Sequence, residues 1–374
     1  MMTMMLRQRL CQFAWTVATY TIGLRRLGNL LQRHILPSAY QDTIFYFDNG
    51  DHISNIIGTS SDDHSKSNND ITNPYNGYLA LTIDDGISRG GKDSSMVPQI
   101  VELFKRYDAH ATFFVCTDYV NEDDIRLLLQ NGHEIGNHMK RDVSGYYFKL
   151  SQEEFQNELR ECNDILNTIL DRYFSDKKNE IEEVEGTDHR SRRKIRWFRP
   201  PQGIMTNAMR NVIEIEGLQC VLGDCYCDDW AFADDTDRDR DASPNKNTDS
   251  TISSSSLQAT TATEGRGSSG NSNGDESNNN KNKNKLISNH VVPLMLKQID
   301  DGNALNSGGR CGGSIAIFHM PEHGFRHGCY RAIEEFLQGI SHQEGKGRNL
   351  RCITLSEMSQ LGTRGRGACS SPTN

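Results

Sequence analysis

Short apolar segments alternate with helical segments along this chain, and this alternation constrains the fold most strongly. Seven segments have the length and composition of β-strands, at 78–83, 111–115, 133–138, 196–199, 220–223, 314–318 and 351–355. Six have apolar residues at helical spacing, at 96–107, 123–130, 151–170, 207–216, 286–299 and 329–340. Strands that alternate with helices indicate a parallel sheet with helical crossovers. The pattern predicts an α/β fold with a closed or nearly closed barrel, and an open doubly wound sheet is the alternative.

Polar segments interrupt this pattern and mark where the folded domain has acquired long loops. Residues 174–194 are heavily charged, and residues 236–285 consist mostly of Ser, Thr, Asn, Asp, Gly and Lys without one aromatic residue. Such segments bury too little apolar area to offset their ordering entropy, so we expect disordered surface insertions. The expected domain is 76–358, interrupted by both insertions, and 359–374 is expected to be a flexible tail. The formal net charge of -9 argues against a nucleic-acid partner, which requires a basic face.

The first 40 residues are rich in arginine and contain no acidic residue. Within them, residues 11–24 are mildly apolar but shorter than the roughly 20 apolar residues that a membrane span needs. We expect a targeting or anchor segment at 1–40 and a linker at 41–75, so that the protein is secreted or contacts a membrane through residues 11–24. An organelle transit peptide is the alternative, since such peptides are also rich in arginine and poor in acids. A surface helix of a soluble protein is the third interpretation.

Polar side chains that can carry chemistry follow the expected strands directly. They are Asp84 and Asp85 after 78–83, His138 at the end of 133–138, Arg199 at the end of 196–199, Asp224 after 220–223 and His319 after 314–318. In parallel α/β folds the carboxyl ends of the strands carry the functional site. Strands that repeatedly end in this way predict one shared cleft.

The expected cleft contains the ligands of a hydrolytic metal site. Asp85, His138 and Asp142 supply an oxygen, a nitrogen and an oxygen, and three protein ligands with one open position are typical of catalytic metal sites. Such a metal lowers the pKa of a bound water and polarises a carbonyl group. We expect Asp84 to take the proton from that water, and His319 on the opposite wall to protonate the leaving group.

Five sequence motifs resemble those of a known family. They are LTIDDG at 81–86, GNHMKRD at 136–142, FRPPQG at 198–203, DCYCDDW at 224–230 and AIFHMPEHG at 316–324. In this order they are similar to the motifs of the polysaccharide deacetylases, carbohydrate esterase family four with its NodB homology domain, over roughly 76–232 and 286–358. The resemblance implies a distorted (β/α) barrel, here of about seven strands. It also implies a divalent metal, zinc or else cobalt, and the removal of acetyl groups from an N-acetylated or O-acetylated sugar polymer.

The resemblance implies a role for each matching residue. Asp84 is the catalytic base, His319 the general acid, and Arg199 the residue that holds Asp84. Asp85 and His138 are the first two metal ligands. The residues expected to bind substrate or to shape its groove are Pro200, Pro201, Asp229 and Trp230.

Three positions depart from the family pattern. Ile83 replaces a phenylalanine, which is a benign exchange of buried apolar residues. Asp142 stands where the family usually has a histidine as third metal ligand, although some members carry aspartate there. This exchange makes the ligands more anionic, so we expect the metal preference to shift from zinc towards harder cations. Tyr226 replaces an aspartate four residues before Trp230, and this changes the surroundings expected for Arg199.

The other histidines in these segments are not expected to belong to the site. His133 lies five residues before His138, which places the two on opposite faces of a strand, so we expect His133 to pack or to lie at the surface. The spacing of His319, His323 and His327 is helical, but an intervening proline and glycine break such a helix. Only His319 is therefore expected in the cleft.

The expected function is that of a metal-dependent hydrolase that deacetylates chitin or a related N-acetylglucosamine polymer. Within the enzyme class, the alternative is a hydrolase of another acetylated glycan or of a small amide. In a different class, the chain is a catalytically silent carbohydrate-binding module. The presence of Asp84 together with His319 favours an enzyme, because a silent module tolerates the loss of its base. No sequence pattern indicates an oligomeric state.

Overall fold

The computed structural model describes residues 24–35, 37–48, 75–143, 145–178, 194–226, 229, 287–304, 311–323, 326–341, 348–361 and 363–364. The predictions for the remaining residues, among them the insertion 236–285 and the substrate-binding residue Trp230, lie outside the described residues.

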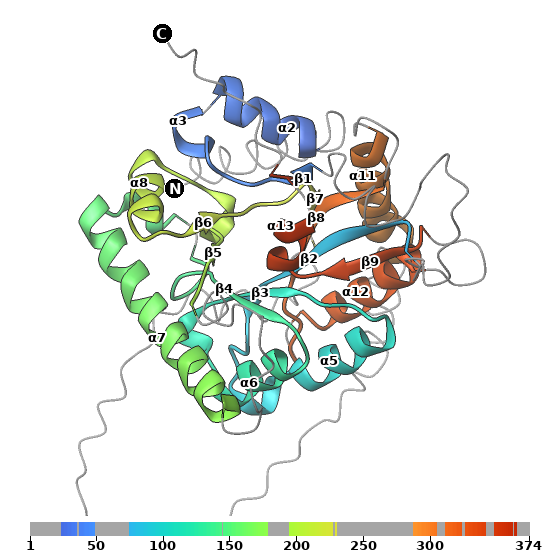
Figure 1. Ribbon diagram of the computed structural model, residues 1–374, viewed down its shortest axis with the longest axis horizontal. Coiled ribbons are helices and arrows are strands. Elements are labelled where there is room, and N and C mark those ends of the chain that lie inside the picture. The colour runs from blue at the N-terminus through green and yellow to red at the C-terminus, as the bar shows by residue number, and fades with distance from the viewer. Residues whose placement is uncertain are drawn as a thin grey trace, which may run out of the picture.

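A curled parallel sheet forms the centre of the protein (Figure 1). Its strands are β2 (Gly77–Gly86), β3 (Thr112–Val115), β4 (Glu134–Asn137), β5 (Trp197–Phe198), β6 (Gln219–Cys220), β7 (Cys225–Tyr226), β8 (Cys311–His319) and β9 (Leu350–Ile353). They are ordered β6-β5-β4-β3-β2-β8-β7, with β9 also paired to β2, and every pairing is parallel. The α/β class and the distorted barrel are therefore confirmed, and β7 is a strand that the sequence pattern did not predict.

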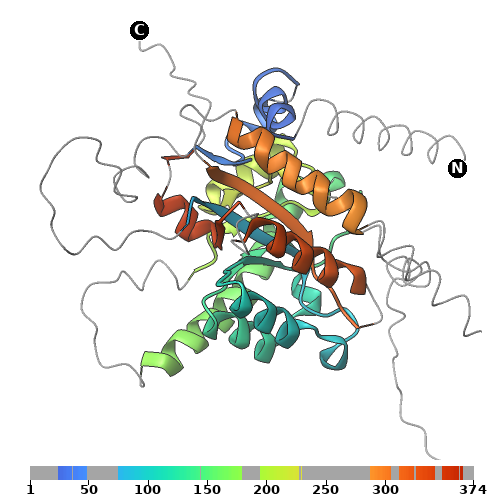
Figure 2. The same cartoon turned by 90° about the vertical axis from the view of Figure 1, so that its right-hand side faces the viewer.

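Helices cover the outside of this sheet (Figure 1). They are α5 (Val97–Arg106), α6 (Glu122–Gln130), α7 (Gln152–Lys178), α8 (Asn207–Ile215), α11 (Val292–Ala304) and α12 (His327–Ile340). Helix α13 (Leu355–Leu361) instead lies within the ring of strands in Figure 1. Short helices are formed by Lys92–Ser94, Thr117–Tyr119, Tyr147–Lys149, Pro201–Gly203 and Ile287–Val291. Helices α11 and α12 pack together beside β8 (Figure 2). Because successive strand residues face opposite sides, Phe113 packs in the layer between sheet and helices, whereas Phe114 joins Trp197 in a second apolar cluster.

Helix α7 extends beyond the predicted 151–170 and includes the first residues of the predicted insertion 174–194. It begins with the expected capping box, in which Glu154 N donates to Ser151 Oγ over 3.2 Å and Ser151 N donates to the Glu154 carboxylate over 2.8 Å. Its later turns also pack on the protein, because Tyr173 is buried and Phe174 contacts the main apolar core. The prediction that the insertion starts at residue 174 was therefore wrong, because the helix continues to Lys178.

The described residues before 49 pack on the sheet, although we expected a targeting segment and a linker there. Helices α2 (Leu24–Leu30) and α3 (Pro37–Tyr40), joined through Leu31–Ile35, lead to β1 (Phe47–Asp48). Strand β1 pairs antiparallel with β10 (Thr363–Arg364), which lies inside the predicted flexible tail. The domain boundaries at 76 and 358 were therefore too narrow.

The same N-terminal residues fill the seam of the curled sheet. Ile44 forms a parallel bridge with Val221, just after β6, and Tyr46 forms an antiparallel bridge with Ser314 of β8. Arg25 is buried and donates to the Asp224 carboxylate over 2.7 Å. These contacts join both sides of the seam. None of the helices that the structure describes is long and apolar enough to cross a bilayer.

Candidate metal and catalytic site

Asp84 is held by a buried arginine. Arg199 follows β5, and its Nη1 donates to Asp84 Oδ1 over 2.7 Å and to Thr82 Oγ1 over 2.8 Å. Its Nε and Nη2 donate to the backbone carbonyls of Val221 and Leu222, each over 3.2 Å. The guanidinium therefore has a fixed position and orients the Asp84 carboxylate. This is the contact that the motif resemblance implied.

His319 lies beside Asp84 because β8 and β2 pair in register at these two residues. The buried Asp229 orients it, with Oδ1 lying 2.6 Å from His319 Nδ1 and Oδ2 accepting from His319 N over 2.8 Å. Burial opposes protonation of this imidazole, but the Asp229 carboxylate raises the pKa of His319 above its ordinary value. Because Nδ1 is engaged, Nε2 is the nitrogen left for chemistry. Asp229 was predicted to bind substrate; its location indicates support of His319 instead.

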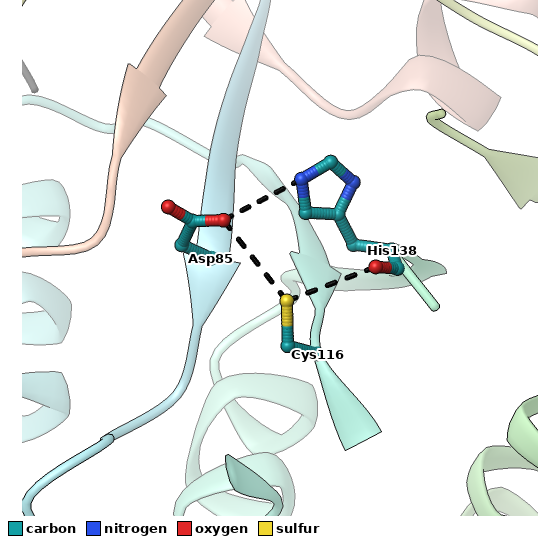
Figure 3. A group of neighbouring side chains, drawn as sticks. All are labelled: Asp85, Cys116 and His138. Carbon is teal, nitrogen blue, oxygen red and sulfur yellow. Dashed lines mark hydrogen bonds and ion pairs between the residues drawn. The ribbon is translucent and has the colours of Figure 1, made fainter. Parts of the chain in front are cut away.

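Three further side chains converge at the ends of adjacent strands β2, β3 and β4 (Figure 3). The ligand atoms of Asp85, Cys116 and His138 lie within 4.8 Å of one another, and all three residues are buried. Asp85 Oδ1 lies 3.5 Å from His138 Nε2 and 4.0 Å from Cys116 Sγ. Such a set of oxygen, nitrogen and sulfur suits a transition-metal cation.

The orientation of His138 also suits a metal ligand. Its Nδ1 lies 2.8 Å from the carbonyl oxygen of Arg199, which can only accept, so this nitrogen carries hydrogen and Nε2 faces Asp85. Metal-binding histidines are commonly oriented in this way. Burial opposes a charged imidazole, but the hydrogen bond that the imidazole donates to Asp85 and the nearby carboxylates raise the pKa of His138 to about 9.

Asp142 lies at the margin of this group. Its Oδ2 is 3.9 Å from His138 Nε2 and accepts from Gln202 N over 3.4 Å. Its Oδ1 is buried and has no hydrogen-bond partner in the described part of the chain. Burial and the Asp85 charge raise the pKa of Asp142 to about 6. The convergent donors and this unsatisfied oxygen fit a divalent cation, with Asp85 and His138 at its centre.

Two arginines contact the opposite oxygen of Asp85. Arg89 Nη2 lies 2.9 Å from Asp85 Oδ2, and Arg326 Nη1 donates to the same atom. Burial opposes ionisation of this carboxyl, but the two guanidinium groups hold the pKa of Asp85 well below its usual range. Oδ1 still faces His138 and Cys116. Sequence reasoning missed both arginines, because neither belongs to the strand-end pattern.

Backbone strain is concentrated around these residues. Asp85, Met139, Gln202 and Arg326 all have positive φ, between 51° and 65°. Asp85 and Arg326 contact each other, Met139 follows His138, and Gln202 N donates to Asp142. Residues other than glycine adopt this conformation at an energetic cost and are enriched in functional sites. The strain therefore supports a functional interpretation of this edge of the sheet.

The two prolines predicted to shape the groove and the three histidines expected outside it lie as follows. Pro200 and Pro201 are buried beside Arg199. His133 is buried between Phe104 and Phe113, as expected for a packing residue. His323 and His327 stack on each other with ring centroids 6.2 Å apart, and the described residues contain no three-residue metal group that includes them.

Two hollows differ in their relation to this site. One of about 250 Å³ lies between the N-terminal residues and α8 and contains no predicted site residue. The other, of about 420 Å³, is lined by Arg89, Lys92, Asp118 and Tyr119 among others. Since Arg89 also contacts Asp85, the second hollow adjoins the candidate site.

Comparisons with known proteins agree with the motif resemblance. Residues 72–221 match the family model described as polysaccharide deacetylase. A peptidoglycan-N-acetylglucosamine deacetylase from Bacillus cereus is 31% identical over 157 residues, which are 41% of this chain and 60% of that protein. A peptidoglycan-N-acetylmuramic acid deacetylase from Bacillus subtilis is 32% identical over 103 residues, which are 27% of this chain and 20% of that protein. The chain thus spans 60% or less of the length of these curated relatives.

Two solved structures are similar to this chain at low sequence identity. A family 4 carbohydrate esterase from Streptomyces lividans, in complex with acetate, has 14% identity and a TM-score of 0.43, with 77% of this chain and 97% of that chain covered. The peptidoglycan deacetylase PdaC from Bacillus subtilis has 17% identity and a TM-score of 0.42, with 78% of this chain and 93% of that chain covered.

Proposed function

Because the chain belongs to the polysaccharide deacetylase family, we propose that it is a metal-dependent hydrolase that removes acetyl groups from an N-acetylated polysaccharide, chitin or a related N-acetylglucosamine polymer. One observation carries the proposal. A carboxylate held by a buried arginine and an imidazole held by a buried carboxylate lie in register on β2 and β8, beside a convergent group of metal-ligand atoms. A base, an acid and a cation site are the parts that amide hydrolysis requires.

In this proposal Asp84 and His319 divide the proton transfers. Asp84 removes the proton from the attacking water, and Arg199 keeps the carboxylate aimed at it. His319 donates a proton from Nε2 to the departing sugar nitrogen, because Asp229 favours its protonated form. Asp85 and His138 would hold the metal, zinc or else cobalt, which when bound would lower the pKa of the water and polarise the acetyl carbonyl.

Exposed aromatic side chains shortly after Asp142 in the chain support a sugar substrate. Tyr146 and Phe148, which follow Asp142 in the chain, are 43% and 44% exposed. Tyr146 is fixed by a 2.6 Å hydrogen bond from its hydroxyl to Glu158 and by edge-on packing against Tyr147. Rigid aromatic rings with an accessible face suit the apolar faces of sugar rings. The names of the curated relatives, which act on N-acetylated sugars of peptidoglycan, favour the same substrate class.

Acetate release tests the proposal. The purified protein, loaded with zinc or with cobalt, is incubated with chitin oligomers, peptidoglycan and an O-acetylated xylan, each with and without a chelator. We expect chelator-sensitive release from an N-acetylglucosamine polymer, loss of release in Asp84→Asn, and unchanged release in the matched surface variant Asp123→Asn, whose carboxylate is 72% exposed. Release from the xylan alone, or from small amides alone, would replace the proposed substrate. Bound metal without release from any substrate would favour a carbohydrate-binding module.

We propose that the protein is secreted, or anchored at a membrane through N-terminal residues 11–24, with organelle targeting as the alternative. Arg25 is buried in its ion pair with Asp224, so we expect any processed N-terminus to lie before it. Mass spectrometry of the mature protein checks this, and cleavage within the packed residues 26–48 would contradict it.

A further inference from the structure

We propose that Cys116 is the third protein ligand of the metal, as a thiolate, in place of Asp142. The proposal rests on the metal dependence of the proposed function. Cys116 directly follows β3, between the strands that end in Asp85 and His138. Its sulfur belongs to the group whose ligand atoms lie within 4.8 Å of one another, whereas Asp142 does not. The ligands then come from three adjacent strand ends.

Backbone hydrogen bonds hold these three strand ends together. Cys116 N donates to the Gly86 carbonyl over 2.8 Å, and His138 N donates to the Val115 carbonyl over 3.0 Å. The thiol lies 4.0 Å from Asp85 Oδ1 and 3.7 Å from the His138 carbonyl oxygen, so its sulfur already faces the first ligand. Asp142 lies on the loop after β4 with 17% of its side chain exposed. Rigid strand ends position ligands better than such a loop.

The charges around the site are consistent with an additional anionic ligand. An aspartate and a thiolate carry one negative charge each, and together they balance a divalent cation. The nearby Asp142 carboxylate adds a further negative charge. Arg89 and Arg326, which both contact Asp85 Oδ2, supply two positive charges. Two guanidinium groups beside a metal ligand otherwise repel the cation. With the Cys116 thiolate as a ligand, the two arginines offset the negative charge of the thiolate and carboxylates that exceeds the charge of the metal.

The proposal specifies the metal and the bond changes. On binding, the Cys116 S–H bond breaks, its proton passes to solvent, and a sulfur–metal bond forms without oxidation or reduction. Thiolate sulfur favours zinc, cobalt or cadmium over magnesium, calcium or manganese. This preference is opposite to the shift towards harder cations that Asp142 suggested from the sequence.

Direct detection of sulfur at the metal tests this ligand in the full chain. In the zinc-loaded wild type, X-ray absorption is expected to show a zinc–sulfur distance of about 2.3 Å. The cobalt-loaded wild type is expected to show a thiolate-to-cobalt charge-transfer band in the near ultraviolet. Cys116→Ser and Cys116→Ala should remove the band and weaken zinc binding at least about tenfold. The control Cys162→Ser removes a nearby buried thiol, which lies 3.3 Å from Thr117 Oγ1, and should retain both.

Each outcome separates this inference from the proposed function. Zinc bound with only oxygen and nitrogen neighbours, or a band that persists without Cys116, overturns the ligand assignment. Should both Cys116 variants fail to fold, the wild-type X-ray measurement still decides whether sulfur binds the metal. Acetate release without a sulfur ligand leaves the proposed function intact. A sulfur ligand without release from any acetylated substrate supports the ligand and refutes the function.

Discussion

The buried pair of Arg199 and Asp84 gives a quantitative test of how the base is held. Arg199→Met removes the guanidinium but leaves the Asp84 carboxylate 6% exposed and without its positive partner. Breaking a buried pair on one side costs about 3–5 kcal/mol. The carbonyls of Val221 and Leu222 lose donors as well, which keeps the expected loss towards the upper end of that range. For a domain of this size, the loss lowers the melting temperature by about 6–20 °C.

Denaturant unfolding followed by circular dichroism measures this loss. A chelator is present throughout, because metal binding to the folded state would otherwise add stability. The control is Arg196→Met, which removes a partly exposed arginine that lies over the Trp197 ring at 4.6 Å and should cost at most about 1 kcal/mol.

A second variant distinguishes pairing from packing. If the cost arises from an unpaired buried carboxylate, then Arg199→Met combined with Asp84→Asn should recover about 2 kcal/mol relative to Arg199→Met alone. A single-variant loss below about 1 kcal/mol, or a double variant whose losses simply add, would refute the reasoning. In that case Arg199 would act as a packing residue, and its role in holding Asp84 would need another explanation.

Three further changes give distinct readouts. Asp229→Asn should lower kcat about 10²–10⁴-fold and move the basic limb of the pH–rate profile to lower pH, because the Asp229 carboxylate raises the pKa of His319. An unchanged basic limb would contradict the role of Asp229 in supporting His319. Arg326→Met should lower the stability of the metal-free protein, because the Asp85 carboxylate loses a positive partner. The same change should tighten zinc binding about tenfold or more in calorimetry, since the guanidinium no longer competes with zinc for Asp85. Weaker zinc binding would contradict this competition. Burial lowers the pKa of His133 to about 3, so the fold holds it neutral while the unfolded chain protonates it near pH 6.5. Stability is therefore lost as the pH falls from about 6.5 to 3, and His133→Gln should reduce that loss in unfolding curves recorded across this range.

The sequence predicted the parts of the site that follow recognisable strands. Asp84, Asp85, His138 and His319 each end an apolar run, and parallel strands bring such ends to one edge. The structure places all four at that edge. Cys116 occupies the same kind of position after the apolar residues 111–115, so the same rule would have identified it. It was missed because a buried cysteine usually acts as a small apolar residue.

Other features depended on contacts between distant parts of the chain. The two arginines on Asp85 come from loops that lack a periodic pattern, and Glu322 brings one of them into place. Its carboxylate accepts from Arg89 N over 2.9 Å and from Gly90 N over 3.2 Å, and thereby ties the loop after β2 to the loop after β8. No local spacing predicts such a contact, because its geometry is set by the pairing of β2 with β8.

The fourth motif shows how one short segment serves both the fold and the site. Its first residue, Asp224, binds Arg25 and the Ile315 backbone, and so fastens the N-terminal residues across the seam. Tyr226, the departure from the family pattern, has its ring centroid 6.2 Å from that of His319 and crosses it edge-on. Asp229 then orients the same imidazole. Because the segment from Asp224 to Asp229 joins the seam to the acid, loss of the Arg25 ion pair should disturb His319 as well as stability. Arg25→Met is therefore expected to lower kcat, whereas a loss of stability with unchanged kcat would show that the seam and the site are independent.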